Sequence, residues 1–414
     1  MEPVANQETY RSYLKFWMGQ LASLLGSSVV FFVIFVWIED ETNSVLMLSV
    51  ASFINLIPML LFFPLAGVIA DLYDRKKIIL IADSSQAFIT VVIALFFIFD
   101  YTVIWVVFLL LGLRSVCQAF HLPTVSALTP SMIPKEKLSR VNGIRFMFLG
   151  IVQLVGPGLG ATLLFFFPIK YILWIDLITF FIALIPLISL KLPTIHTEEK
   201  RLESKSFKRE IKEGFSIIKA IPGFSVIIIL AMLLYLLSQP VMTLAPHFIK
   251  TVHGGNDFSL ALNSMIFQGG MILGSILVSL KKRWKNKMRT LFLGIMIINI
   301  GFLIYALSPI GVFLFMQIGL LIMGFIMPIV EVIIMTVTQI TVPLDKMGRV
   351  SSILNLLMMV ASPLGAILAG PLSLILGIST LYVLCALISI IVTIIPYLSS
   401  SFRSIDYDHI TLGL

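Results

Sequence analysis

Four ionisable side chains interrupt long apolar stretches of this 414-residue sequence, and their types define the chemistry that is available there. They are Asp83, Arg114, Asp176 and Glu331. A charge at the centre of a membrane costs about 2.5–3.5 kcal/mol on insertion scales, so such a residue needs a partner or water and is a functional candidate. An acid there can exchange a proton or attract a cation, and an arginine can pair with the acid.

These four residues lie at different depths in their apolar stretches. Arg114 is near the middle of its stretch, and by the helical rise Asp176 lies at a similar depth, which makes it one possible partner. Glu331 lies well inside its stretch and can titrate or attract a cationic substrate. Asp83 is closer to one end, where a structural role or snorkelling to the membrane surface competes with a role in coupling.

Uncharged polar residues in the same stretches are candidates for lining a substrate cavity. They are Gln118, His121 and Gln239. His121 can relay protons or can be a packed neutral imidazole, and the glutamines can bind a ligand or bridge helices. The five histidines are scattered and no carboxylate pair is present, so we expect no catalytic residue, no metal and no cofactor.

The composition indicates a membrane protein. Hydrophobic residues make up 59% of the chain and charged residues only 12%, about half the charged share of a soluble domain. Apolar runs of about 18 residues or more predict membrane-spanning helices, because a helix satisfies its own backbone hydrogen bonds in lipid. Twelve runs are present: 14–38, 45–70, 78–99, 103–130, 141–167, 169–190, 223–249, 258–280, 288–308, 311–341, 350–376 and 379–399.

The basic residues fall mostly on one side of the membrane if the twelve spans alternate in direction. The opposite side has only Lys170 and Lys250, together with the acidic run 39–41. Short basic loops stay in the cytoplasm, so we predict that both termini are cytoplasmic. The net charge of +8 therefore reflects membrane orientation and does not indicate nucleic-acid binding.

The chain divides into two halves around a polar segment. We predict a six-helix bundle over 1–191, a cytoplasmic linker over 192–222 and a second six-helix bundle over 223–414. Apolar residues at helical spacing in the linker predict an amphipathic helix on the membrane surface, with a solvated linker as the alternative. The entries to the fifth and eleventh spans, 134–142 and 343–351, share Pro, an acid, Lys, Arg and Val, which indicates that the halves are repeats.

The loop between the second and third spans reads Gly-Val-Ile-Ala-Asp-Leu-Tyr-Asp-Arg-Lys-Lys over 67–77. The Asp71 carboxylate and the Arg75 guanidinium can pair across neighbouring helix ends and stabilise one conformation. This loop resembles a signature of the major facilitator superfamily, in which it stabilises the outward-open state, although Asp74 departs from the fuller form of that signature. The alternative interpretation is a plain basic loop. The resemblance assigns a gating role to Gly67, Asp71, Arg75 and Lys76.

The fifth span carries a second motif. Pro157 removes a backbone donor, and the glycines around it permit close helix contact. The spacing resembles, in part, the antiporter motif of the same superfamily, which marks exporters. The residues that match are Gly143, Gly156, Pro157 and Gly160.

The first span, with its small residues from Gly19 to Ser27, resembles the drug-efflux branch that includes macrolide exporters. The resemblance implies an all-α membrane protein of 12 helices in two pseudo-symmetric bundles. We expect a monomeric secondary transporter in the cell membrane that exports amphiphilic small molecules by proton antiport with alternating access. A lipid or lysophospholipid flippase of the same fold is the alternative.

Overall fold

The computed structural model describes residues 7–189, 216–281, 286–342 and 347–398. In these residues, 12 helices are long and apolar enough to cross a membrane. The predicted all-helical membrane protein is therefore confirmed. By contacts, the chain divides into two compact units, Met1–Arg201 and Leu202–Leu414.

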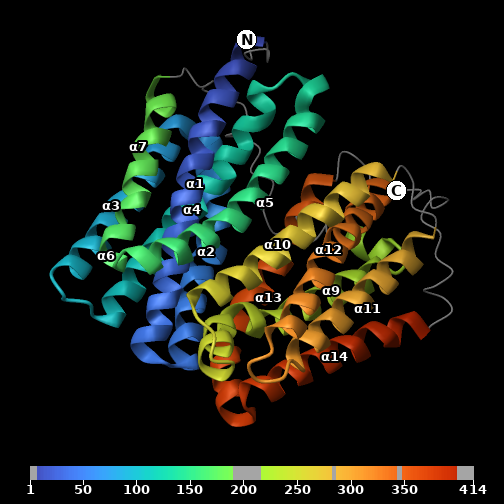
Figure 1. Cartoon of the computed structure of the whole chain (residues 1–414). Coiled ribbons are helices and arrows are strands. Elements are labelled where there is room, and N and C mark those ends of the chain that lie inside the picture. The colour runs from blue at the N-terminus through green and yellow to red at the C-terminus, as the bar shows by residue number, and fades with distance from the viewer. Residues whose placement is uncertain (1–6, 190–215, 282–285, 343–346, 399–414) are drawn as a thin grey trace. The chain divides into compact units, whose positions relative to one another are not determined.

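The first unit contains long helices that are coloured blue to green in Figure 1. Its sixth span is made of a short helix, α6, followed by α7. The helices of this unit are α1 (Gln7–Thr42), α2 (Val45–Leu72), α3 (Arg75–Ile98), α4 (Ile104–Met132), α5 (Lys135–Phe166), α6 (Ile169–Ile172) and α7 (Trp174–Ser189).

The second unit also consists of long helices in its described part. Its first helix continues into a π-helical turn, Phe248–Val252. The helices of this unit are α9 (Phe224–His247), α10 (Asp257–Leu280), α11 (Lys287–Ala306), α12 (Phe313–Thr341), α13 (Met347–Leu376) and α14 (Ile378–Leu398).

Short polar turns with capping residues separate the apolar helices. Ser44 caps α2, and Asn256 caps α10 by accepting a hydrogen bond from the Ser259 backbone N–H at 2.9 Å. Asn43 and Asp100 adopt positive φ angles of 43° and 55°, a conformation that asparagine and aspartate tolerate better than other non-glycine residues. These residues end one span and start the next within a few positions.

The helices pack in corresponding pairs within the two units. In the first unit, α1 packs against α5 and α7, α2 pairs with α4, and α3 contacts α4 and α7. In the second unit, α9 packs against α13 and α14, α10 pairs with α12, and α11 contacts α12 and α14. The four helices α1, α3, α4 and α7 carry the polar side chains that form the candidate site.

The predicted linker helix in 192–222 falls mostly outside the described residues. Residues 216–220 are helical. Ile218, one of the predicted apolar positions, is buried with Ile221 and Phe224 in the hydrophobic core of the second unit. This end of the linker therefore packs against protein.

Candidate functional site

Arg114 and Asp176 form a buried ion pair in the first unit. The Arg114 Nη1 atom lies 2.7 Å from Asp176 Oδ2, and the two side chains are 11% and 4% exposed. Arg114 comes from α4 and Asp176 from the first turn of α7. Because each charge is the partner of the other, the pair lowers the cost of placing either of them among apolar helices.

Two hydroxyl groups complete this ion pair. Ser27 Oγ donates to Asp176 Oδ1 at 2.8 Å, and Thr90 Oγ1 lies 2.6 Å from Asp176 Oδ2. The Arg114 guanidinium also contacts both hydroxyls. Four helices, α1, α3, α4 and α7, thus supply a set of mutually satisfied polar groups, which we call the ion-pair layer.

A second polar group, which we call the histidine layer, contains Gln20, Asp83 and His121. Gln20 Nε2 donates to Asp83 Oδ2 at 3.0 Å, and its Oε1 lies 2.9 Å from His121 Nε2. His121 Nε2 is also 3.3 Å from Asp83 Oδ1. Asp83 is only 6% exposed, so the snorkelling role considered from its sequence position is wrong: its partners lie on α1 and α4.

The two layers follow from a regular spacing in three helices. The pairs Gln20 and Ser27 on α1, Asp83 and Thr90 on α3, and His121 and Arg114 on α4 are each seven residues apart. Seven residues are nearly two helical turns, or about 10 Å along the axis, so both members of each pair lie on the same helix face. The helices therefore stack one polar layer above the other.

A small space of about 20 Å³ is lined by residues of both layers. This volume is about that of one water molecule, and it is far below the about 300–1,000 Å³ of a drug-sized site. Gln118 and His121, which the sequence suggested as substrate-cavity residues, therefore line a water-sized space. Its lining is Gln20, Ser23, Leu24, Ser27, Asp83, Gln86, Ala87, Gln118, His121, Asp176 and Phe180.

The motif loop connects helix ends within the first unit. Asp74 caps α3 by accepting from the Lys76 N–H at 2.8 Å, Arg75 Nε donates to the Ala70 carbonyl at 3.1 Å, and Lys76 Nζ donates to the Ile188 carbonyl at 2.7 Å. The predicted pairing through the Asp71 side chain falls outside the described side chains.

Gly67, which the resemblance assigns to the gating loop, lies near the C-terminal end of α2. A Cβ atom placed on Gly67 would have no neighbour within 4 Å among the described residues.

The antiporter-motif helix α5 packs tightly against α1. A Cβ on Gly156 would come within 2.7 Å of Ser28 Cβ, and one on Gly160 within 2.7 Å of Phe32 Cδ1. Pro157 lies inside α5, which continues past it to Phe166. The surroundings of Gly143 fall outside the described side chains. Close contact at the two matched glycines is thus confirmed.

The remaining candidates belong to the second unit. Glu331 lies on α12 with an exposed side chain. Gln239 on α9 contacts α13, where a Cβ on Gly365 would lie 2.6 Å from Gln239 Cβ. The structure therefore groups the predicted residues Arg114, Asp176, Asp83, His121 and Gln118 in one unit, and it assigns Glu331 and Gln239 to the other unit.

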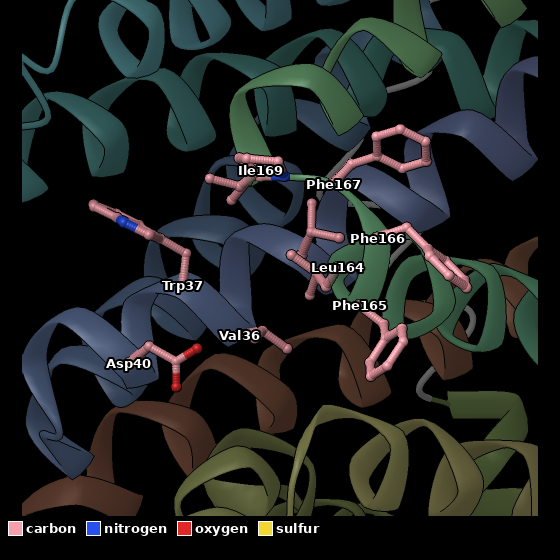
Figure 2. Close-up of a pocket in the computed structure, with 10 residues that line it drawn as sticks. Val36, Trp37, Asp40, Leu164, Phe165, Phe166, Phe167 and Ile169 are labelled. Carbon is pink, nitrogen blue, oxygen red and sulfur yellow. The ribbon is translucent and has the colours of Figure 1, made fainter.

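A larger pocket of about 390 Å³ lies at the C-terminal end of α1. Figure 2 shows it between Trp37 and Asp40 on α1 and residues 164–169, where α5 ends and α6 begins. Aromatic side chains at helix ends are typical of the interface between membrane and water. The pocket is large enough for a small amphiphile.

Several residues of the two layers were not predicted as site residues. Thr90 and Gln86 lie on α3, and Gln20, Ser23 and Ser27 lie on α1. The signal for them is the recurrence of polar residues at intervals of three, four and seven within apolar spans, which places them on one helix face.

Buried charges shared among membrane-spanning helices are typical of proteins that move ions or substrates across a membrane. The chain belongs to the Major Facilitator Superfamily, whose profile matches residues 16–366. It is thus a multi-pass membrane protein and a transporter, not an enzyme.

The chain is similar to macrolide efflux protein A of Streptococcus pyogenes, with 26% identity over 96% of this chain and 99% of that protein. It is 22% identical to the multidrug efflux pump Tap of Mycolicibacterium fortuitum, over 90% of this chain and 92% of the pump. The nucleoside transporter NupG has the same fold, with a TM-score of 0.72 and 14% identity over 93% of this chain and 98% of that chain. The predicted resemblance to the drug-efflux branch is therefore confirmed.

Proposed function

We propose that this protein is a secondary active transporter that exports amphiphilic small molecules, macrolides among them, in exchange for protons. The observation that carries the proposal is the end-to-end similarity to a macrolide efflux protein, over 96% of this chain. The close α1–α5 contact at Gly156 and Gly160, in the motif that marks exporters, supports the same direction of transport.

The proposed mechanism is alternating access between two pseudo-symmetric six-helix bundles, over 1–191 and 223–414, joined by the linker 192–222. The repeated helix pairings support it: α1–α5 corresponds to α9–α13, α2–α4 to α10–α12, and α3–α7 to α11–α14. Parallel repeats related by an axis along the membrane normal are typical of this fold, and rocking of one repeat against the other exposes a central site to each side in turn.

Proton coupling would use the intramembrane charges Arg114, Asp176, Asp83 and Glu331. A proton that enters from outside neutralises an acid inside the membrane, and the change of charge alters the relative stability of the two access states. The loop residues Gly67, Asp71, Arg75 and Lys76 would act as the gate on the cytoplasmic side. We infer that the protein works as a monomer in the cell membrane with both termini in the cytoplasm.

Transport into proteoliposomes tests this function. The purified protein is reconstituted, a pH gradient of either sign is imposed, and the uptake of labelled erythromycin or of a labelled lysophospholipid is followed. We expect erythromycin uptake that reverses with the gradient and is abolished by a protonophore. Transport that ignores the gradient would refute proton antiport, and transport of the lysophospholipid alone would favour a flippase.

A matched pair of variants controls this experiment. Arg114→Gln removes a charge from the ion-pair layer and should abolish gradient-driven transport. Lys250→Gln removes a charge from a pair with Asp257 near the start of α10 and should leave transport unchanged.

A further inference from the structure

The two ring nitrogens of His121 have different surroundings. The neighbours of Nε2 determine that it carries a hydrogen, whereas Nδ1 has no hydrogen-bond partner among the described residues. Both neighbours of Nε2, Gln20 Oε1 at 2.9 Å and Asp83 Oδ1 at 3.3 Å, are hydrogen-bond acceptors. Because Gln20 donates its amide to Asp83, its oxygen is the atom that faces the imidazole. Nε2 therefore carries a hydrogen, and in the neutral ring Nδ1 has a free lone pair.

The Nδ1 atom of His121 is buried and has no hydrogen-bond partner among the described residues. His121 also lines the water-sized space, together with Gln118 and Gln86. A buried polar atom of this kind is normally hydrogen-bonded, and a polar space of this size can hold one water. The imidazole thus has an unused proton acceptor, and its side chain lines a space that is large enough for one water.

With Asp83 ionised and His121 neutral, the histidine layer has one negative charge without a cationic partner among the described residues. Arg114 and Asp176 neutralise each other, whereas Asp83 has only Gln20 and His121 as described polar partners. An uncompensated carboxylate in an apolar interior is costly. Protonation of the imidazole gives an imidazolium beside the Asp83 carboxylate, and the histidine layer becomes neutral.

We propose that the Asp83–His121 dyad is the proton-binding site of the transport cycle, and that the proton reaches Nδ1 through the water-sized space that both layers line. The inference rests on the proposed proton antiport. One proton from bulk water adds to the Nδ1 lone pair to give the imidazolium, and the same proton leaves Nδ1 for water when the layer opens to the other side. Gln20 is a positioning residue that keeps Nε2–H directed at its acceptors.

Other titratable and charged groups near the dyad are few. On α4 itself, Arg114 and Cys117 lie within two turns of His121, and α7 contributes Asp176 to the lining of the same space. From α5, Arg145 binds Thr129 at the far end of α4, with Tyr13 of α1 beside them. Among the described side chains, α2 brings no charged group to this part of α4.

The test separates proton-coupled transport from simple substrate exchange in proteoliposomes. His121→Gln keeps a hydrogen-bonding side chain but cannot gain a charge in this pH range. We expect pH-gradient-driven erythromycin uptake to fall by about tenfold or more, while counterflow with equal pH on both sides stays close to wild type. The matched control, His247→Gln at the end of α9, should change neither rate.

A second measurement does not depend on transport. The infrared difference spectrum of the detergent-solubilised protein between acid and neutral pH should contain an imidazolium component from His121. A double difference between wild type and His121→Gln isolates this component, and His247→Gln should still contain it. If His121→Gln does not fold, Asp83→Asn replaces it, and we expect the same loss of coupling with retained counterflow.

Two results would overturn the proposal: gradient-driven uptake that survives in His121→Gln, or a parallel loss of uptake and counterflow in a folded variant. Wild-type transport that ignores the pH gradient would instead refute proton antiport itself. In that case the infrared signal still decides whether the dyad binds a proton.

Discussion

At the scale of single residues, the first unit contains the Arg114–Asp176 ion pair beside the Asp83–His121 dyad, which we propose as the proton-binding site. The Asp176 carboxylate accepts hydrogen bonds from Arg114, Ser27 and Thr90, so its negative charge is already compensated. In the coupling that we propose, Asp83 is therefore the acid beside the proton, and Asp176 contributes through the ion pair that joins α4 and α7.

The effects of substituting Arg114 and Asp176 on the free energy of unfolding should therefore depend strongly on each other. We expect Arg114→Gln or Asp176→Asn alone to lower the free energy of unfolding by about 3–5 kcal/mol, because each leaves a buried charge without its partner. The double variant should lose less than the sum of the two single variants. Melting temperatures in detergent check this.

The pair Lys250–Asp257 is the control for this double-mutant cycle. Its side chains are 15% and 29% exposed, and a partly exposed pair contributes only about 0–1 kcal/mol. Additive effects of Arg114→Gln and Asp176→Asn would contradict the ion-pair layer.

His253 should make stability depend on pH. It lies between spans, buried against Phe248 at a ring-centroid distance of 4.5 Å. Burial lowers the pKa of His253 below its ordinary value, and a hydrogen bond to the Pro309 backbone opposes the shift in part. Below the ordinary pKa the unfolded chain binds more protons than the folded protein, so the stability that His253 contributes is complete above about pH 6.5 and is lost as the pH falls.

Melting temperatures at neutral and at acid pH measure this effect. His253→Gln should reduce the loss of stability on acidification, and His247→Gln should leave it as in wild type. An unchanged pH dependence in His253→Gln would show that other groups cause it.

At the scale of helices, the glycines of the antiporter motif let α5 lie close to α1 because they have no side chains. Gly156 and Gly160 are one turn apart and face Ser28 and Phe32, which are also one turn apart on α1. Helix association in membranes depends on close van der Waals packing. The motif therefore sets the distance between α5 and the helix that carries Gln20 and Ser27.

A comparison of alanine substitutions at two glycines of α5 tests this packing. Gly156→Ala should destabilise the protein by about 1–3 kcal/mol, because the new methyl group overlaps Ser28. Gly150→Ala adds the same methyl group where nothing lies within 4 Å, and it should be neutral or stabilising by about 0.5–1 kcal/mol. Thermal melting of the two variants compares them, and equal losses would contradict a tight α1–α5 contact.

At the scale of the whole chain, the helix pairings repeat but the chemistry does not. The α3–α7 pair contains Thr90 and Asp176, whereas the corresponding α11–α14 pair contains Asn299, whose Nδ2 donates to Thr393 Oγ1 at 3.0 Å. The second unit thus uses a neutral hydrogen bond where the first has a charge. This asymmetry supports proton binding in the first unit.

An even number of spans requires both termini on one side of the membrane. We expect a fluorescent reporter that folds only in the cytoplasm to be active at either end of the chain, because the basic loops favour that side. Alkaline phosphatase, which is active only outside the cytoplasm, should be inactive at both ends. Activity of phosphatase at one end only would require an odd number of spans.

Much of the fold could be predicted from the sequence because lipid imposes a local rule. Each span must satisfy its own backbone, so a run such as 103–130 predicts a helix without knowledge of its neighbours, and α4 occupies Ile104–Met132. The family resemblance could be predicted for a related reason, since the loop 67–77 and the helix 143–161 contain contiguous motifs.

The sequence by itself determined the number of spans, the branch of the family and the identity of the buried charges, because these depend on residues close together in the chain. Only the tertiary structure decided that Asp83 faces His121 and that Asp176 faces Arg114. Such pairing depends on how each helix is rotated about its axis and on which helices are neighbours. Packing among α1, α3, α4 and α7 determines both.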